Sequence, residues 1–394
     1  MNRTLSCRPA LVVSTCVIDL LMVAHCSSAR GAVGDWLHAY QSPFPRALAG
    51  RAIPIALDDN VALVGAHFDR STSGVTVLNA SNGAVKGSFF TPTFPDDLAL
   101  DGEWSLAVSN GLRVYRDFEY SYTWDPLGPG GAPTNFGEIA IDGTHAAAVI
   151  DDSVWFYDLQ TRQTLASFGA EAMAGVSSAA ASVHVSVDLW DGLAVVGVGS
   201  FYGNGSVPGK AYVVDATTGE LLRELTSESD PPTSQYAHSV AISEGRVLVG
   251  DPTYSGSLSS AGAAYLFDLD SGEQIVRLDL EDPAVGESLG GAVDLDGTAA
   301  VIGASRHGTP HVGSGAVYFY DIESPNSLVR HEKSVTGIRV YNGSRVAVSG
   351  DVAASAPNVL YGYSNFFSTV PEPSSSYLAA VVVAWGAKLR RRRA

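Results

Sequence analysis

Pairs of histidines and carboxylates are the residues of this chain best suited to chemistry. His307 and His311 lie four residues apart, the spacing at which two imidazoles share a metal ion on one face of a helix. A Gly-Thr-Pro stretch separates them and is incompatible with that helix, so we predict no metal site there. His331-Glu332 lacks the partner histidine of a zinc-protease helix, because the required position is Val335.

Other catalytic patterns are equally scarce. The chain contains no phosphate-binding loop and no dinucleotide fingerprint. Asp268-x-Asp270-Ser271-Gly272 has oxygens that suit calcium, but a hairpin turn capped by its own aspartate is the favoured interpretation. We therefore predict no catalytic residue and no cofactor, with calcium kept as an alternative.

A repeated unit supplies the elements that would position such residues. Its cleanest copy is Leu289–Ile322, in which Ala292–Leu295 alternates apolar and polar residues as a half-buried strand does. Asp296-Gly297 then makes a tight turn, and Thr298–Ala304 returns as an apolar strand suited to burial on both faces. Ala316–Tyr320 is the third strand, and a fourth is clearer in other copies.

The first turn of the unit recurs between two apolar runs along most of the chain. Its seven copies, spaced by 41 to 53 residues, are Asp59-Asn60, Asp101-Gly102, Asp142-Gly143, Asp191-Gly192, Glu244-Gly245, Asp296-Gly297 and Asn342-Gly343. This spacing is typical of four-stranded propeller blades, which bury their faces only when stacked around an axis. We predict an all-β protein with one seven-bladed β-propeller of four-stranded antiparallel blades.

Composition and the first residues of the chain indicate an exported acidic protein. The net charge is −17 at pH 7, so nucleic acid and anionic lipid would be repelled. Residues 1–32 have the order of a secretory signal peptide, because Arg3 and Arg8 precede an apolar run that ends in small residues. All three cysteines lie in this segment, so the mature protein would have no disulfide and no thiolate metal site.

The C-terminal segment, residues 370–394, carries a second export pattern. It contains Val370, Pro371, Glu372 and Pro373, then the short apolar helix expected over Tyr377–Leu389, then four arginines. The segment resembles the PEP-CTERM sorting signal of Gram-negative bacteria. The resemblance implies recognition by an exosortase, transient membrane association of the C-terminal segment, and delivery to the cell surface or extracellular matrix. The alternative is a chance Pro-Glu-Pro before a short tail anchor.

The repeats also resemble a known family. Phe136–Gly143, Tyr236–Ile242 and Leu289–Gly297, each followed by an apolar strand, are similar to FG-GAP repeats. The resemblance implies a seven-bladed propeller of the integrin-α type. Longer integrin-type copies hold a calcium loop between the first two strands, whereas the turns here are two residues long, so we do not expect calcium at these turns. Asp215–Glu220 resembles a quinoprotein repeat, without its tryptophan pattern.

These patterns divide the chain into four parts. We expect a signal peptide at 1–32, a lead-in segment at 33–50, the propeller at 51–367 and the sorting signal at 370–394. Residues 36–50 and Val359–Phe367 are the expected partners in ring closure, because a propeller commonly pairs a strand near one terminus with one near the other.

One face of the propeller is the expected place for a ligand. Long loops at Ser200–Lys210, Asp251–Gly262 and Ser305–Gly315 share this long-loop face with the connections Thr226–Gln235 and Glu281–Glu287. The predicted binding residues on it are Tyr202, Asn204, Asp251, Tyr254, His307 and His311. The alternative is that these are solvated Gly/Ser loops that hold no ligand.

Two functions of different class remain open. The favoured one is a non-enzymatic, surface- or matrix-associated propeller that binds a glycan, an extracellular polymer or a protein. The alternative is a secreted propeller enzyme: a lyase, a hydrolase or a quinoprotein-like dehydrogenase. Inward-pointing His, Arg, Tyr and Asp at one channel mouth would favour the enzyme, whereas the expected channel residues are mostly Ala, Val, Ile and Leu with isolated Asp.

Overall fold

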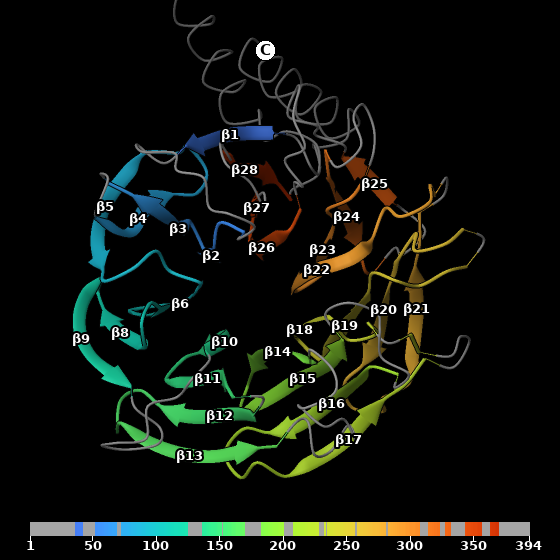
Figure 1. Cartoon of the computed structure of the whole chain (residues 1–394), viewed down its shortest axis with the longest axis horizontal. Coiled ribbons are helices and arrows are strands. Elements are labelled where there is room, and N and C mark those ends of the chain that lie inside the picture. Colours follow the sequence, from blue (N-terminus) through green and yellow to red (C-terminus); the bar gives the residue numbers. More distant parts are fainter. Residues whose placement is uncertain are drawn as a thin grey trace, which may run out of the picture. The chain divides into compact units, whose positions relative to one another are not determined.

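A computed structural model shows seven four-stranded antiparallel sheets arranged in a ring (Figure 1). The prediction of a seven-bladed, all-β propeller is therefore confirmed. The described residues are 36–41, 52–68, 72–124, 136–151, 153–169, 183–200, 208–227, 232–233, 235–256, 258–280, 283–307, 314–323, 328–331, 343–356 and 363–369. The predicted signal peptide and sorting signal lie outside them.

Each blade is a meander whose first strand lines the axis and whose fourth strand forms the rim (Figure 1). Blade one holds β2 (Ile55–Asp58), β3 (Val61–His67), β4 (Ser73–Asn79) and β5 (Val85–Thr91). Blade two holds β6 (Asp97–Asp101), β7 (Trp104–Val108), β8 (Leu112–Arg116) and β9 (Glu119–Trp124). Blades three and four hold β10 (Phe136–Asp142), β11 (His145–Ile150), β12 (Ser153–Asp158), β13 (Gln163–Phe168), and β14 (Val183–Trp190), β15 (Leu193–Ser200), β16 (Lys210–Asp215), β17 (Leu221–Leu225). Blades five and six hold β18 (Ser239–Ser243), β19 (Arg246–Asp251), β20 (Ala263–Asp268), β21 (Gln274–Leu278), and β22 (Leu289–Asp296), β23 (Ala299–Ala304), β24 (Ala316–Asp321), β25 (Leu328–His331).

Blade seven closes the ring with strands from both ends of the propeller. It holds β26 (Arg345–Ser349), β27 (Val352–Ala356) and β28 (Tyr363–Ser368), and its outermost strand is β1 (Trp36–Gln41). Strand β1 pairs antiparallel with β28, for example Ala39 with Asn365. The expected pairing of the two terminal regions is confirmed, and the predicted lead-in segment contributes a strand of the last blade.

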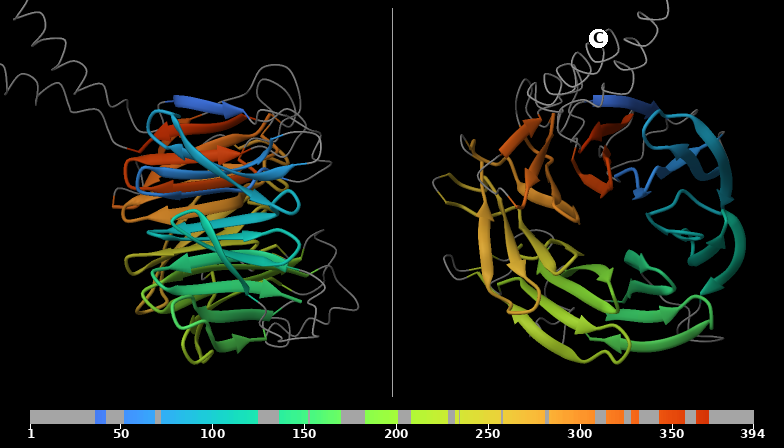
Figure 2. Two further views of the ribbon diagram at one scale, coloured as in Figure 1. Left: turned by 90° about the vertical axis from the view of Figure 1, so that its left-hand side faces the viewer. Right: turned by 180° about the vertical axis from the view of Figure 1, so that it is seen from behind.

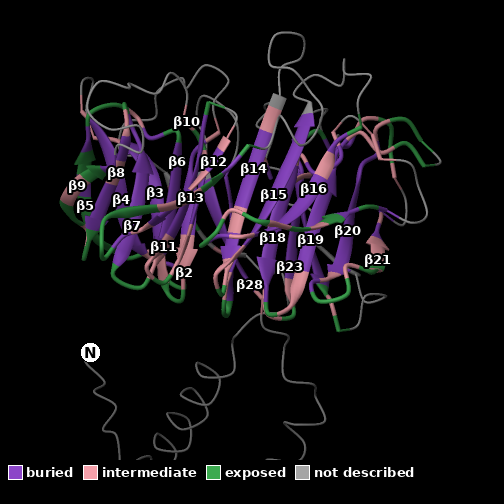
Figure 3. Cartoon of the chain, turned by 90° about the horizontal axis from the view of Figure 1, so that it is seen from below, coloured by how far each residue is buried: buried purple, intermediate pink, exposed green. Residues whose placement is uncertain are grey.

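The hydrophobic core lies between neighbouring blades rather than at the axis. Second strands such as β7 and third strands such as β20 are buried almost throughout, as their apolar sequences require. Each of the six hydrophobic clusters of the described residues joins two adjacent blades. Turns and loops lie at the two faces of the ring (Figure 2), and many of the exposed residues lie in them (Figure 3).

The first turn of several blades differs by one residue from its predicted position. Asp101, Asp142 and Asp296 end their strands, and the glycine that follows each takes the positive φ. In blade seven the prediction was wrong, because the turn lies at Gly350-Asp351 and Asn342-Gly343 precedes the first strand. The Asn-Gly pattern was misleading because a second turn-forming pair, Gly350-Asp351, follows eight residues later.

The outermost strands of five blades share a β-bulge. In blades one to five, one extra residue of the fourth strand interrupts the pairing with the third strand. The extra residues are Lys86, Ser121, Leu165, Leu222 and Ile275. A bulge reverses which face the following side chains occupy, so simple alternation does not predict their direction in these strands.

Glycines in the second strands allow neighbouring blades to approach closely. A Cβ on Gly250 would lie 2.1 Å from the carbonyl oxygen of Gly290, and one on Gly303 would lie 2.0 Å from that of Gly343. Both contacts join a second strand to the chain that enters the next blade. The Val-Gly and Ile-Gly pairs of the repeat therefore mark backbone contacts between blades.

No helix of the described residues is long and apolar enough to cross a membrane.

Candidate functional site

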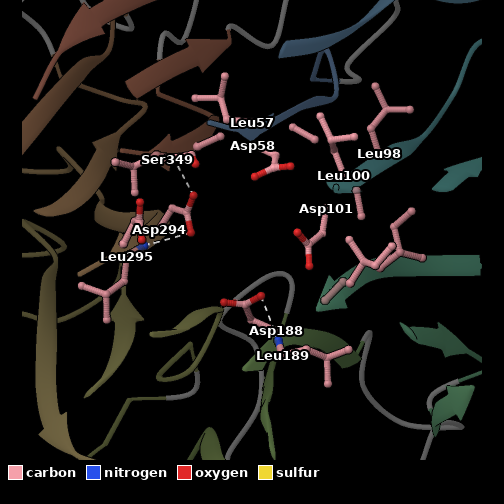
Figure 4. A pocket seen from close by; sticks show the side chains of 18 of the residues that line it. Leu57, Asp58, Leu98, Leu100, Asp101, Asp188, Leu189, Asp294, Leu295 and Ser349 are labelled. Atoms are coloured by element: carbon pink, nitrogen blue, oxygen red, sulfur yellow. Dashed lines mark hydrogen bonds between the residues drawn. The ribbon is translucent and has the colours of Figure 1, made fainter. Parts of the chain in front are cut away.

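The first strands of the blades line an axial cavity of about 340 Å³. Figure 4 shows Asp58, Asp101, Asp188 and Asp294 pointing into it, while the neighbouring leucines point away. Its lining contains a single cation, Arg345, and eight carboxylates: Asp58, Asp97, Asp101, Glu138, Asp142, Asp188, Asp294 and Asp296. The cavity is therefore strongly acidic.

Most of these carboxylates hold the next blade in place. Asp58 Oδ2 accepts the Gly102 N–H at 2.7 Å, Asp101 accepts the Gly143 N–H, and Asp142 Oδ2 accepts the Asp191 N–H at 2.7 Å. Each acceptor ends a first strand, and each donor lies in the first turn of the following blade. We call these contacts the turn ring.

The turn ring continues through blades five, six and seven. Ser243 Oγ accepts the Gly297 N–H at 3.2 Å, and Asp296 Oδ2 accepts the Gly350 N–H at 2.6 Å. Ser349 Oγ then accepts the Asp59 N–H at 2.8 Å, which returns the ring to blade one. Trp190 occupies the corresponding place in blade four. The Asp-Gly pairs thus join blades as well as forming turns.

A second group of carboxylates lies deeper in the cavity. Asp97 Oδ2 accepts the Ile139 N–H at 3.0 Å, Asp188 Oδ2 accepts the Ile242 N–H at 2.9 Å, and Asp294 Oδ2 accepts the Val348 N–H at 2.6 Å. Each bond again runs to the first strand of the next blade. These acids therefore satisfy backbone donors that face the axis.

Arg345 connects blades that are not neighbours. Its Nη1 lies 3.2 Å from Asp97 Oδ1 in blade two and 3.6 Å from Glu138 Oε1 in blade three. His184 Nε2 lies 3.6 Å from the same Glu138 oxygen, and the rings of His184 and His238 are 4.4 Å apart. We call these five side chains the polar belt. Because Arg345 belongs to blade seven, the belt crosses the axial channel.

Burial shifts the protonation of the belt and of its neighbour Asp188. It raises the pKa of Asp97 to about 6, although the Arg345 guanidinium opposes the rise. Burial raises the pKa of Asp188 to about 7, and the charges of Asp142 and Glu138 add to the shift. Burial, together with Arg345, lowers the pKa of His184 to about 4. At neutral pH the belt therefore combines a neutral imidazole with a guanidinium and carboxylates.

Chemically, such a group can attract a cation or exchange protons with a bound molecule. Among the described residues, no set of three or more His, Cys, Asp and Glu side chains is arranged to hold a metal ion. The cavity is more polar than the sequence indicated, because Glu138 and Arg345 were not identified as inward-facing from the sequence. The strand period could have identified them, because residues two apart, such as Asp294 and Asp296, share one face of a strand.

The three predicted binding residues that the structure describes do not form one group. Tyr202, Asn204 and His311 lie outside the described residues. Asp251 is only 1% exposed, and its Oδ1 accepts the Thr233 hydroxyl at 2.6 Å. That bond ties the end of β19 to the connection that enters its own blade. Asp251 therefore does not present its side chain to solvent.

His307 is also buried, at 3% exposure. Its Nδ1 lies 2.5 Å from Glu287 Oε1, and Glu287 belongs to the connection between blades five and six. Thr93 and Ser109, whose hydroxyl oxygens are 3.1 Å apart, make the same kind of contact in blade two. Polar pairs between connections and second-strand ends thus join the chain on the long-loop face. A surface contact from His307 would require this pair to open.

Among the predicted binding residues that the structure describes, Tyr254 reaches the surface, and it is half-buried. Its ring packs edge-on against Tyr265 at 6.3 Å and lies 4.9 Å from the Arg277 guanidinium carbon. Nearby in the same loop is Leu258, 36% exposed, and the adjacent connection carries Val285, 69% exposed.

Backbone hydrogen bonds join the two segments that carry Leu258 and Val285. The N–H groups of Gly286, Ser288 and Leu289 donate to the carbonyls of Ser259, Ser260 and Ala261 at 2.9, 3.2 and 3.0 Å. Gly262 and Leu289 also form an isolated parallel bridge. Leu258, Val285 and Tyr254, which we call the loop patch, are therefore carried by a fixed surface rather than by independent loops.

The proposed calcium alternative at Asp268 has a simpler explanation. Asp268 Oδ1 accepts both the backbone N–H and the hydroxyl of Ser271 at 2.9 Å, as a self-capped turn does. Asp215 Oδ1 makes the same contacts with Thr217. These hydrogen bonds lower the pKa of both aspartates. The favoured interpretation of the sequence, a hairpin turn capped by its own aspartate, is confirmed.

Comparison with known proteins supports the fold. The Neurospora crassa Pan2 WD40 domain aligns with a TM-score of 0.56 at 9% identity, covering 86% of this chain and 98% of that chain. KlHsv2 with loop 6CD replaced by a Gly-Ser linker aligns with a TM-score of 0.49 at 10% identity, covering 78% and 90%. No family model and no curated protein matches the chain. The likeness to the Pan2 domain shows a β-propeller fold alone.

Proposed function

We propose that this protein is an exported, non-enzymatic β-propeller that binds a glycan, an extracellular polymer or a protein at the cell surface or in the extracellular matrix. The observation that carries the proposal is the loop patch. Leu258 and Val285 are exposed apolar side chains on segments joined by three backbone hydrogen bonds. Rigid loops that expose apolar groups on a stable scaffold are a common form of recognition surface.

The axial cavity supports the same choice. Its carboxylates accept backbone N–H groups of the following blade or pair with Arg345, and therefore already stabilise the ring. A catalytic acid or base needs an atom that can exchange a proton with a substrate. Leu258 and Val285 of the loop patch expose their side chains, so we assign recognition to that patch.

Replacement of both exposed apolar residues tests this assignment. We expect Leu258→Ser with Val285→Ser to weaken co-sedimentation with the extracellular polymer of the producing cells by about tenfold or more. Leu222→Ser with Ile275→Ser is the matched control, because both residues are exposed at bulges of rim strands. Equal binding by the loop-patch variant and the wild type would overturn the assignment.

The export part of the proposal rests on the two terminal segments of the sequence. They resemble a signal peptide and a PEP-CTERM signal, so an exosortase is the proposed processing partner. Alanine at Pro371, Glu372 and Pro373 should move the protein from the surface fraction to another fraction and increase its mass by the uncleaved tail. Unchanged location and mass would remove this part of the proposal without affecting the binding test.

A secreted enzyme is the second candidate, and the polar belt favours it. Arg345, Glu138 and Asp97 line one cavity, a neutral His184 contacts Glu138, and their shifted pKa values are typical of active sites. An enzyme of this kind would release soluble fragments from a polymer. Arg345→Met should then abolish release while the loop-patch variant retains it.

A further inference from the structure

The outermost strand of blade two is the aromatic stretch that neither candidate function explains. The rim strand β9 has the sequence Glu-Tyr-Ser-Tyr-Thr-Trp, and Tyr120 within it is 55% exposed. Tyr122 and Trp124 are accounted for, because they pack toward Tyr157 of blade three. Tyr120 is therefore the aromatic residue of β9 that is left exposed at the rim.

The β-bulge separates Tyr120 from its aromatic neighbours. Val114 pairs with Tyr122, and the next residue, Tyr115, pairs with Tyr120, so Ser121 is the extra residue. Because adjacent residues of β8 point to opposite faces, Tyr120 lies on the face opposite Tyr122. The bulge therefore places one tyrosine on the rim surface while the other packs between blades.

Three contacts hold the Tyr120 ring in position. Its hydroxyl lies 3.0 Å from Thr123 Oγ1, and the Tyr115 ring meets it edge-on at a centroid distance of 6.0 Å. The Arg113 guanidinium carbon lies 5.5 Å from the ring centroid. A ring fixed in this way loses little conformational freedom when a ligand binds against it.

A shallow hollow of about 600 Å³ lies at the start of β9. It is lined by Arg116, Asp117, Glu119, Tyr120 and Ser121. Arg116 is committed to Glu103 through two hydrogen bonds of 2.9 Å, so its charge is compensated. The remaining groups offer two carboxylates and a hydroxyl beside one aromatic ring.

This combination fits a molecule with an apolar ring face and several hydroxyl donors. We propose that the Tyr120 hollow is a binding subsite for a neutral saccharide, with the sugar ring against Tyr120 and its hydroxyls donating to Asp117. A uronic or sulfated sugar would meet this carboxylate and a chain of net charge −17. A cationic side chain would compete with Arg113 for the aromatic ring.

The subsite is independent of the loop patch. Strand β9 and the loops of blade five lie on different sides of the ring (Figure 1). A polymer chain could therefore engage both places, or bridge two molecules of the protein. Failure of the loop-patch test would leave this proposal intact, and the reverse also holds.

Affinity electrophoresis of the full chain in gels that contain a neutral polysaccharide tests the subsite. Dextran, galactomannan and a mixed-linkage glucan are the neutral probes, and alginate is the anionic probe. We expect retardation by at least one neutral polymer and not by alginate, an affinity about tenfold lower for Tyr120→Ala, and an affinity close to wild type for Tyr120→Phe.

Val85→Ala is the matched control. Val85 precedes the bulged residue of β5, as Tyr120 precedes that of β9, and it is 64% exposed. It should leave retardation unchanged, and circular dichroism should show that all variants are folded. The proposal is overturned if no neutral polymer retards the wild type, if Tyr120→Ala binds like the wild type, or if only a lysine-rich peptide binds in a Tyr120-dependent manner.

Discussion

At the scale of single residues, aspartate has three roles in this ring, and its place relative to the strand end decides which. Asp101, the last residue of its strand, accepts an N–H group of the next blade. Asp188, two residues before its strand ends, points into the axial cavity and accepts the Ile242 N–H. Asp268, at the end of a third strand, caps its own turn. One residue type thus serves blade contacts, cavity charge and turn formation.

Removal of the belt cation should expose the repulsion among the cavity acids. Arg345→Met leaves Asp97 and Glu138 without their partner, so we expect the free energy of unfolding to fall by about 2 kcal/mol at pH 7. The loss is below that of a fully buried pair because the Arg345 side chain is 31% exposed. Denaturant unfolding measures the change, and Arg345→Met with Asp97→Asn should recover part of it. A loss of stability that the second substitution leaves untouched would contradict this account.

Asp188 makes stability depend on pH in a defined direction. Its pKa is about 7 in the folded protein and near 3.8 when exposed, so between these values the folded state binds more protons. The free energy of unfolding contributed by Asp188 therefore falls as the pH rises from about 4 to 7. Asp97, with a pKa of about 6, acts in the same direction, whereas His184 opposes both.

Asp188→Asn isolates this contribution. The variant should gain stability relative to the wild type as the pH rises from 5 to 8, and the difference curve removes the effect of His184. Thermal melts at fixed ionic strength are the measurement, and Asp270→Asn in the exposed turn between β20 and β21 is a suitable control. A difference that stays constant with pH would show that Asp188 titrates normally.

At the scale of strands, the close contacts between blades depend on glycine. A Cβ on Gly250 would meet the Gly290 carbonyl oxygen at 2.1 Å, and backbone cannot move aside as a side chain can. We expect Gly250→Ala to lower the free energy of unfolding by about 1–3 kcal/mol in denaturant titrations. Gly87→Ala is the control, because a Cβ at that strand position meets no atom within 4 Å. Equal stability of the two variants would show that blades five and six separate readily.

Strand order and strand count followed from the sequence, but strand faces and the last blade did not. Apolar runs around Asp-Gly turns identify β22, β23 and their counterparts because burial and turn geometry both act locally. The turn of blade seven was misplaced, since Asn342-Gly343 also fits a turn pattern. The rim bulges carry no sequence signature of their own, and the face occupied by Tyr120 is visible only in the pairing register.

At the scale of the whole molecule, the ring is closed in two ways. Strand β1 adds the fourth strand of blade seven, and the Ser349 hydroxyl accepts the Asp59 N–H of blade one. Tyr40 strengthens the junction, because its hydroxyl lies 2.7 Å from Thr76 Oγ1 in blade one. Bringing together residues this distant in sequence costs loop-closure entropy, and the contacts of the closed ring must offset that cost. Loss of a closing contact should therefore lower stability.

Removal of β1 tests this closure. A chain that starts at residue 42 should melt at a much lower temperature than one that starts at Gly34, because β28 is left as an unpaired edge strand. A synthetic peptide of residues 34–42 should restore part of the melting temperature. Identical melting of the two chains, with or without peptide, would mean that β1 is not part of the closed ring.

The candidate site was less predictable than the fold, for a physical reason. Loop residues such as Asp251 and His307 were identified by type, yet both are buried because their partners, Thr233 and Glu287, lie on a different segment. Distant pairing of this kind leaves no local pattern. The polar belt likewise joins blades two, three, four, five and seven, so only the closed ring brings it together.

One measurement separates the binding function from the enzyme most directly. The full chain is incubated with extracellular polymer from the producing cells, and both the protein that sediments with the polymer and the soluble fragments released are quantified. We predict that the wild-type protein sediments with the polymer and releases no soluble fragments. The Leu258→Ser, Val285→Ser double variant should no longer sediment, whereas Arg345→Met, tested below its melting temperature, should sediment like the wild type. Release of fragments that Arg345→Met abolishes would contradict the binding function and place an active site in the axial cavity.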